Sequence, residues 1–375
     1  MTASRITCRA AVLQHAGGKW DVVEVELDPP KVHEVRVRVV ASGLCHSDDH
    51  HVTGDVPVAH LPYCGGHEGS GIVEEVGPGV QGLEPGDHVV TSFIPGCGLC
   101  RWCASGMQNL CNNGAKLALG PLMDGTYRMW LDGVGVSQGG LLGTFSEQMV
   151  ISEYSCVKIA PHLPLDSAAL VACGVPTGWG SAVNAAGVEP GHVVIVMGIG
   201  GIGINAVQGA HISGAERVIA VDPVPFKREM ALKVGATDAY QSLDEAIETA
   251  RGATNGQGAD SIIVTVGVLR GEHLGAALQA IRKAGTLVVT AVAGHQEAGI
   301  PVNLNEFAMY QRRIQGVVYG MMAPSKDIPR LLSLYERGRL KLDELITNRY
   351  RLDEINAGYE DMHAGLNIRG LVEFP

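Results

Sequence analysis

Thiol, imidazole and carboxylate side chains gather at three places in this 375-residue sequence. Cys45 opens a stretch rich in polar groups, residues 45–50, and His67 follows about two dozen residues later. Cys173 lies roughly a hundred residues further along the chain. Together these three residues would give a zinc ion three protein ligands and leave a fourth position open. That coordination is typical of a catalytic zinc site, because a structural site uses all four positions for protein ligands.

A second set of four thiols lies between residues 97 and 111, with two, two and seven residues between successive cysteines. Four thiols so close together can surround one zinc ion tetrahedrally and leave no open position. The spacing differs from the bacterial ferredoxin run, so we expect a structural zinc rather than an iron–sulfur cluster or a redox thiol cluster. The four predicted ligands are Cys97, Cys100, Cys103 and Cys111.

Residues 192–222 have the pattern strand, glycine-rich turn, helix, strand. In this context a Gly-x-Gly-x-x-Gly turn lets the backbone approach a pyrophosphate, which the N-terminus of the following helix favours. Asp222 ends the second strand, 19 residues after the last glycine. Its carboxylate would accept hydrogen bonds from the ribose hydroxyls and repel a 2′-phosphate, so the pattern favours NAD over NADP. The glycines of the turn are Gly198, Gly200, Gly201 and Gly203.

The elements that must position these residues are of two kinds. The first part of the chain contains short, closely spaced strand patterns, which indicate a β-rich module. After Pro176 the buried-strand patterns at 261–266 and 286–290 alternate with helical stretches. This alternation predicts an α/β fold with a doubly wound parallel sheet. The predicted domains are a zinc-binding β-rich module, 1–175 and 319–375, and an inserted dinucleotide-binding module, 176–318.

Composition excludes several classes of function. The net charge is −11 and there is no basic run, so nucleic acid is not an expected partner. No apolar run reaches the roughly 18 residues of a membrane span, and we recognise no signal peptide. Nine cysteines, an odd number, indicate free thiols and metal ligands in a reducing compartment, so we expect a cytoplasmic protein. Small buried side chains are the expected role of Cys8, Cys64 and Cys156.

From end to end, the sequence resembles the zinc-dependent medium-chain alcohol dehydrogenases. The resemblance rests on the motifs G-L-C-H-S-D-D-H, G-G-H-E-G-S-G, C-G-V-P-T-G, G-I-G-G-I-G and N-I-R-G, together with the four-cysteine loop. It implies a GroES-like catalytic domain with an inserted Rossmann domain. It also implies two zinc ions per chain, one catalytic and one structural, with NAD(H) as coenzyme and a homodimer or homotetramer as the assembly.

Two branches of that family are especially similar. The segments V-D-P-V-P-F-K-R-E and C-R-W-C-A-S-G-M-Q-N-L-C resemble the nitrosoaniline-dependent alcohol dehydrogenases. Those enzymes hold NAD(H) tightly and regenerate it through a second electron acceptor. The other branch is the thiol-dependent formaldehyde dehydrogenases, which use glutathione or mycothiol. They need a basic residue near the substrate pocket, for which Lys116 is a candidate.

The resemblance assigns roles at the metal site and in the alcohol pocket. Ser47 and His50 match the proton relay, and Phe93 matches a residue of the alcohol pocket. Glu68 matches a carboxylate that lies near the zinc and can serve as an alternate ligand. Asp48 matches the residue that orients the zinc-bound imidazole. The catalytic zinc ligands of the family correspond to Cys45, His67 and Cys173.

For the coenzyme, Asp222 and Lys227 match contacts to the adenosine ribose, and Thr177 matches a residue beside the nicotinamide. Arg369 and His46 match contacts to the pyrophosphate. Many alcohol-oxidising relatives have Arg where this chain has His46. Because a neutral imidazole would hold the pyrophosphate less firmly than a guanidinium, tight NAD retention would need other contacts.

The predicted reaction is hydride transfer between an alcohol or aldehyde and NAD, with zinc stabilising the alkoxide and His50 receiving the proton. We expect His51, the neighbour of His50, to be a surface histidine. His60, His88 and His192 are expected to have structural roles. Two alternatives stay open from the sequence. One is the thiol-dependent formaldehyde dehydrogenase, and the other is a non-catalytic NAD-binding protein whose zinc is purely structural.

Overall fold

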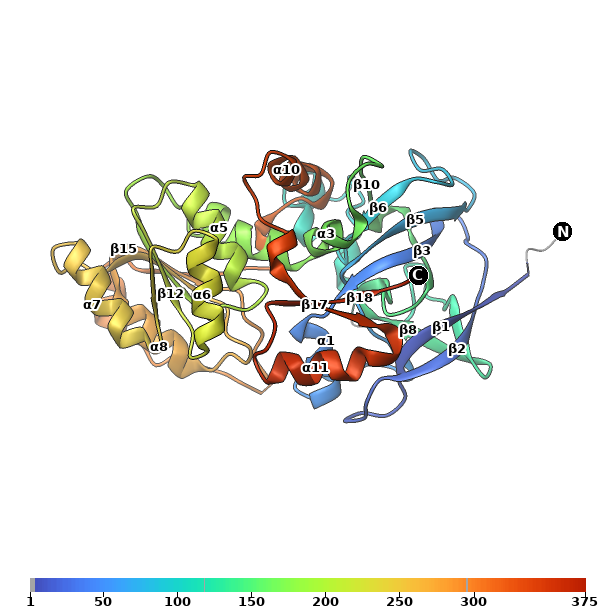
Figure 1. Cartoon of the computed structure of the whole chain (residues 1–375), viewed down its shortest axis with the longest axis horizontal. Coiled ribbons are helices and arrows are strands. Elements are labelled where there is room, and N and C mark those ends of the chain that lie inside the picture. Colours follow the sequence, from blue (N-terminus) through green and yellow to red (C-terminus); the bar gives the residue numbers. More distant parts are fainter. Residues whose placement is uncertain (1–3, 118, 295) are drawn as a thin grey trace. The chain divides into compact units, whose positions relative to one another are not determined.

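The computed structural model describes residues 4–117, 119–294 and 296–375. These form two compact units, shown in sequence colours in Figure 1. The first unit contains the chain up to Cys173 together with Ala323–Arg337 and Leu342–Pro375, and the second contains Gly174–Met322 and Gly338–Lys341. The chain therefore returns to the first unit at Ala323, later than the residue 319 expected from the sequence. The reason is that the turn Tyr319–Met321 packs against α4 (Gly174–Gly180) inside the second unit.

A seven-stranded sheet forms the larger part of the first unit, in the order β10-β6-β5-β3-β18-β17, with β9 also pairing to β3. The central strand β3 follows the alternation of its sequence, because Val35, Val37 and Val39 are buried. The strands of this sheet are β3 (Glu34–Gly43), β5 (Gly69–Val76), β6 (His88–Thr91), β9 (Gln148–Ser152), β10 (Cys156–Lys158), β17 (Ile346–Arg351) and β18 (Arg369–Glu373).

Five further strands of the first unit close into a barrel in the order β1-β2-β7-β8-β4. Its interior is filled by apolar side chains that include Cys8 and Cys64, as the sequence predicted for these two thiols. Burial raises the pKa of Cys8 to about 12, so its thiol stays protonated. The barrel strands are β1 (Ile6–Leu13), β2 (Asp21–Leu27), β4 (Tyr63–Cys64), β7 (Met129–Leu131) and β8 (Val134–Gln138).

The helices of the first unit are few and mostly short. The longest, α10, begins at Pro324, a residue that is compatible with the first turn of a helix. Tyr359 of α11 packs in an aromatic cluster, with its ring centroid 6.3 Å from those of Trp20 and Phe145. The helices are α1 (His46–Thr53), α2 (Arg101–Ala104), α3 (Leu165–Ala169), α10 (Pro324–Glu336) and α11 (Ile355–His363).

The second unit is a six-stranded parallel sheet in the order β13-β12-β11-β14-β15-β16. This is the doubly wound order expected for a dinucleotide-binding sheet. Residues of α7 and α8 share one apolar core with the sheet, and α5 and α6 cover its other face (Figure 1). The strands are β11 (Val193–Met197), β12 (Arg217–Val221), β13 (Asp238–Tyr240), β14 (Ala259–Val264), β15 (Ile281–Val289) and β16 (Arg313–Gly316).

From α5 onward, the helices of the second unit alternate with the strands of its sheet, as the sequence predicted. Helix α8 ends at Ala280, and β15 begins at the next residue. The helices are α4 (Gly174–Gly180), α5 (Gly203–Ile212), α6 (Pro225–Lys233), α7 (Leu243–Ala253), α8 (Gly271–Ala280) and α9 (Leu304–Met309).

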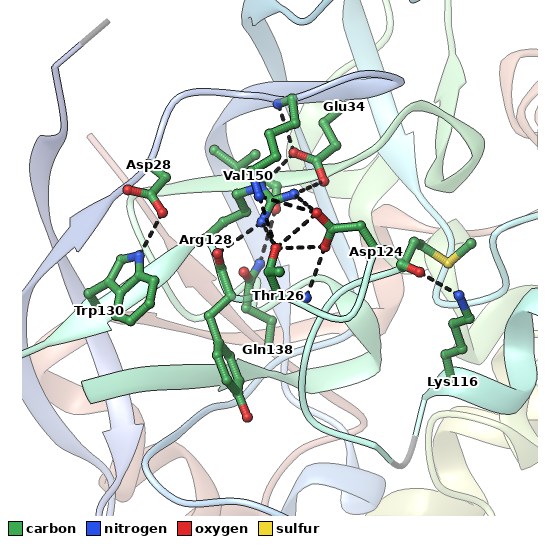
Figure 2. Close-up of polar contacts among 12 residues, drawn as sticks. Asp28, Glu34, Lys116, Asp124, Thr126, Arg128, Trp130, Gln138 and Val150 are labelled. Atoms are coloured by element: carbon green, nitrogen blue, oxygen red, sulfur yellow. Dashed lines mark hydrogen bonds and ion pairs between the residues drawn. The ribbon is translucent and has the colours of Figure 1, made fainter. Parts of the chain in front are cut away.

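A buried ion-pair network anchors the long connection between the four-cysteine segment and β7 (Figure 2). The Arg128 side chain is fully buried and makes two hydrogen bonds of 2.7 Å to the two carboxylate oxygens of Glu34. It also donates to Asp124 at 2.7 Å and to Thr126 at 2.5 Å. This arrangement fixes residues 124–128 against the start of β3.

Within the described ranges, every helix is too short or too polar to cross a lipid bilayer.

Candidate active site

Four potential metal ligands meet in the first unit. The donor atoms of Cys45, His67, Glu68 and Cys173 all lie within 4.8 Å of one another, and all four residues are buried. Two thiols and an imidazole are the donor types that zinc prefers, and a carboxylate is also compatible with zinc. The set therefore fits the catalytic zinc that the sequence predicted.

Strand pairing brings the first three of these residues together. The end of β3 pairs with the start of β5, so that Ser42 lies opposite Gly69 and the Gly43 N–H donates to the Glu68 carbonyl at 3.0 Å. Cys45 follows β3 and Glu68 precedes β5, so both donors emerge at the same edge of the sheet. Cys173 reaches this edge after α3, which packs on β3 and β5.

The four potential ligands also alter the acidity of one another. A hydrogen bond from the Cys173 thiol and the neighbouring His67 hold the pKa of the Cys45 thiol well below its usual range, although burial acts in the opposite direction. A thiolate is the form of cysteine that binds metal. The environment of Cys45 therefore already favours the metal-binding form.

Asp48 fixes the ring of His67. Its Oδ2 atom lies 2.9 Å from His67 Nδ1, and its Oδ1 atom accepts a hydrogen bond of 2.9 Å from the Gly66 N–H. The carboxylate is 1% exposed, so water does not compete for it. With Nδ1 directed at a carboxylate, Nε2 is left as the metal-binding nitrogen.

Glu68 and Arg369 form a fully buried ion pair beside the cluster. A side chain at position 43 would collide with this pair, since a Cβ there would lie 2.5 Å from Glu68 Oε2. Burial raises the pKa of Glu68 to about 8, with Arg369 opposing the shift. Arg369 was assigned to the coenzyme pyrophosphate by resemblance, and in the structure its guanidinium contacts Glu68.

The predicted relay residues lie on α1, immediately after Cys45. The Ser47 hydroxyl is 3.6 Å from the Cys45 sulfur. The His50 side chain is 2% exposed, its Nδ1 lies 3.1 Å from Asp55, and its ring centroid is 5.0 Å from that of His46. No hydrogen bond joins Ser47 directly to His50 among the described residues, so a relay through both would need a further group between them.

A cavity of about 280 Å³ opens beside the metal cluster, and all of its lining residues belong to the first unit. Ser47, His67 and Cys173 contribute to its wall together with Phe93, whose ring meets the His67 ring edge-on at 5.5 Å. Lys116 is not part of this lining, and its ammonium donates to the Met123 carbonyl instead (Figure 2).

Two histidines of this cavity were not expected from the sequence to take part in a site. His51, predicted to be a surface residue, and His60, predicted to be structural, both line the cavity. The sequence carried no signal for them, because their place depends on how α1 and the segment after it pack against β4 and β8.

The four-cysteine segment forms the second predicted metal cluster. The sulfurs of Cys97, Cys100, Cys103 and Cys111 lie within 4.8 Å of one another. Backbone N–H groups of Leu99 and Cys100 point at the Cys97 sulfur, each at 3.4 Å. Backbone hydrogen bonds lower the pKa of Cys100 to about 6. A set of four thiols with no vacant donor position fits a structural zinc.

In the second unit, the glycine-rich turn connects β11 to α5. Gly198 has φ +93°, and a Cβ on Gly203 would lie 1.9 Å from the Gly198 carbonyl oxygen, so both positions require glycine. Gly200 faces open space. The Asp222 carboxylate accepts from the Ile199 N–H at 2.8 Å, which ties the end of β12 to this turn.

Other predicted coenzyme residues lie near these elements. Lys227 is on α6 and is partly exposed, and Thr177 is buried on α4. In the first unit, His46 is partly exposed and its Nε2 lies 3.7 Å from Asp49. Arg228, for which the sequence carried no signal, donates to the Asp222 carbonyl at 2.7 Å and so stabilises the end of β12.

Comparison with known proteins identifies the family. Residues 31–161 match the alcohol dehydrogenase GroES-like domain, and residues 201–337 match the zinc-binding dehydrogenase model. The chain is 48% identical to the NDMA-dependent alcohol dehydrogenase of Amycolatopsis methanolica, over 97% of this chain and 98% of that protein. It is 46% identical to alcohol dehydrogenase B of Mycobacterium bovis, over 98% of both chains.

Solved structures agree with this assignment. A zinc-binding alcohol dehydrogenase domain protein from Burkholderia ambifaria superposes with a TM-score of 0.92 at 32% identity, covering 99% of this chain and 100% of that one. Benzyl alcohol dehydrogenase from Acinetobacter calcoaceticus superposes with a TM-score of 0.91 at 29% identity and the same coverage. The chain therefore belongs to the zinc-binding, medium-chain alcohol dehydrogenase family of oxidoreductases.

Proposed function

We propose that this protein is an NAD-dependent zinc alcohol dehydrogenase that interconverts an alcohol and its aldehyde. The observation that carries the proposal is the buried donor set of Cys45, His67 and Cys173 beside a cavity large enough for a small organic molecule. Of the alternatives raised by the sequence, the non-catalytic one does not agree with membership of a dehydrogenase family.

Each residue of the site has a part in the proposed reaction. When bound, zinc would act as a Lewis acid on the alcohol oxygen, and NAD would accept the hydride from the alcohol carbon. Ser47 takes up the proton that the hydroxyl loses, since it lies beside Cys45 and faces the cavity. His50 receives that proton through a group bound between them, and Asp55 connects His50 to the surface. Asp48 holds the His67 ring throughout.

The second unit would hold the coenzyme. The glycine turn offers backbone N–H groups at the start of α5, and Asp222 at the end of β12 favours NAD over NADP. Lys227, Thr177, His46 and Arg369 remain proposed contacts.

A relative is named NDMA-dependent alcohol dehydrogenase, and the resemblance to the nitrosoaniline-dependent branch implies a tightly held coenzyme. The bound coenzyme would accept a hydride from the alcohol, and a second substrate such as a nitrosoaniline would reoxidise it. The hydrogen bonds from Arg228 and Ile199 to Asp222 would keep this residue in place beside the glycine turn.

The cysteines of both potential metal sites are free thiols, which supports a reducing compartment. We propose that the protein is located in the cytoplasm. A homodimer or homotetramer remains the assembly predicted from the family.

The test is an absorbance spectrum of the purified, desalted protein before and after addition of benzyl alcohol, without added NAD. We expect the coenzyme to stay bound through desalting. Addition of the alcohol should then increase the absorbance band of the reduced nicotinamide, and a nitrosoaniline should remove that band. Alcohol oxidation only with added NAD would support a freely exchanging coenzyme. Oxidation of formaldehyde alone, with a strict need for a low-molecular-weight thiol, would replace the proposal with the thiol-dependent alternative.

A further inference from the structure

Two histidines in the wall of the cavity share an unusual arrangement. In each, one ring nitrogen faces a backbone carbonyl: His51 Nδ1 lies 3.1 Å from the Val56 oxygen, and His60 Nε2 lies 2.9 Å from the Gly135 oxygen. A carbonyl can only accept a hydrogen bond, so the nitrogen that faces it must carry the proton. This fixes the tautomer of both neutral rings.

The other nitrogen of each ring then keeps its lone pair. These atoms are His51 Nε2 and His60 Nδ1, and neither has a hydrogen-bond partner within the described part of the chain. Aromatic contacts hold both rings in place, with His51 edge-on to Tyr63 at 5.1 Å and His60 against Tyr127 at 5.0 Å. The acceptors are therefore oriented before any ligand arrives.

Most of the surrounding wall is apolar. Val56, Val58, Phe93 and Leu117 contribute to the same lining, and it includes no lysine or arginine among the described residues. An acceptor in such a wall loses its water when an apolar ligand fills the cavity, and it regains a partner only if the ligand carries a donor.

We propose that His51 and His60 select alcohols that carry a second hydrogen-bond donor, such as a phenolic or distal aliphatic hydroxyl. This inference rests on the proposed alcohol dehydrogenase activity, since the reacting hydroxyl must lie at the Cys45–His67–Cys173 cluster. The rest of the substrate then occupies the cavity and donates its second hydroxyl to the free imidazole nitrogens. The two histidines determine specificity and take no part in hydride transfer.

The experiment compares 4-hydroxybenzyl alcohol with the similarly sized 4-methylbenzyl alcohol. The kcat/KM ratio of the two is measured for the unaltered enzyme and for the double variant H51N/H60Q. Asn at position 51 and Gln at position 60 can each keep the donor that faces the backbone carbonyl while removing the second ring nitrogen. Dividing one ratio by the other cancels the electronic effect of the ring substituent on hydride transfer.

We expect the preference for the hydroxylated alcohol to fall about tenfold in the double variant, as for the loss of one or two neutral hydrogen bonds. Direct binding is a second readout, with 4-hydroxybenzamide and 4-methylbenzamide titrated calorimetrically into the enzyme that contains zinc and NAD(H). The affinity for 4-hydroxybenzamide should fall in the variant, and the affinity for 4-methylbenzamide should not change. H162Q, at an exposed histidine outside the cavity, is the matched control.

The inference is overturned if the double variant keeps both the kcat/KM ratio of the two alcohols and the difference in affinity between the two amides. If the unaltered enzyme oxidises both alcohols and their kcat/KM ratio is the same in the double variant, the inference fails but the proposed function stands. If it oxidises neither alcohol, the proposed function itself fails. A second double variant, H51F/H60F, keeps two flat rings in the wall, so it tests the same claim if H51N/H60Q does not fold.

Discussion

Asp48 is the residue that orients the imidazole of His67, a proposed zinc ligand. Because it holds both His67 Nδ1 and the Gly66 N–H, its replacement would leave the ring free to turn. We predict that D48N lowers the affinity for the zinc at the Cys45 cluster by about 10- to 100-fold, as for other carboxylates that orient a metal-bound imidazole. Competition with a chromophoric chelator measures this affinity.

The neighbouring residue provides the matched control. Asp49 is also buried on α1, but it pairs with His363 at 2.7 Å and makes no hydrogen bond or ion pair with His67. D49N should therefore leave the zinc affinity within a few-fold of the unaltered protein. Equal loss in the two variants would mean that helix α1 as a whole, rather than the Asp48–His67 contact, determines metal binding.

Asp124 gives a prediction about acid stability. Burial alone would raise the pKa of this carboxyl, but hydrogen bonds from Arg128 and Thr126 outweigh it and hold the pKa well below the ordinary value of 3.8. Folding therefore favours the ionised form. Its contribution to stability is complete above about pH 4 and is lost as the pH falls from there toward the folded-state pKa.

The measurement is urea unfolding of the unaltered protein and of D124N between pH 6 and pH 3. The difference in unfolding free energy should be constant near neutral pH and should shrink below pH 4. Because the side chain is 40% exposed, the difference should be modest at every pH. A difference that grows on acidification would show that the sign is wrong.

At the scale of elements, the connection between the four-cysteine segment and β7 forms part of the cavity wall through Leu117 and Gly120. The Arg128 network fixes the end of this connection to β3 (Figure 2). We predict that R128M destabilises the protein by about 3–5 kcal/mol, because it leaves Glu34 buried without its partner. Chemical unfolding monitored by circular dichroism would measure the loss.

The double variant E34Q/R128M separates the cost of a stranded charge from the loss of packing. It should be more stable than R128M, since no unpaired carboxylate remains. If both variants lose the same stability, the packing of the Arg128 side chain, and not its ion pair, anchors the connection.

At the scale of the whole molecule, the sequence predicted the parts whose chemistry is local. The α/β fold and the family are confirmed. The four-cysteine cluster and the glycine turn lie within short segments, so their spacing alone carries the information. Cys45, His67 and Cys173 come from distant segments, and their grouping was expected through the family motifs. The structure brings their donor atoms together.

What the sequence did not predict depends on tertiary packing. The place of His51 follows from how α1 packs against β4, and that of His60 from how the next segment meets β8. A histidine looks the same in a sequence whether it is solvated or lines a cavity. The buried Arg128 is similar, because an arginine between Tyr127 and Met129 gives no sign of its distant partner Glu34. The return of the chain at Ala323 depends on the packing of residues 319–321 against α4.

The most direct test of the account is zinc stoichiometry in the unaltered protein and in Cys45→Ala. We predict two zinc ions per chain in the first and one in the second, with alcohol oxidation lost and the melting temperature little changed. C103S is the matched control, since it should lose the other zinc. One zinc ion in the unaltered protein, or two retained in Cys45→Ala, would contradict the claim that Cys45, His67 and Cys173 hold a catalytic metal.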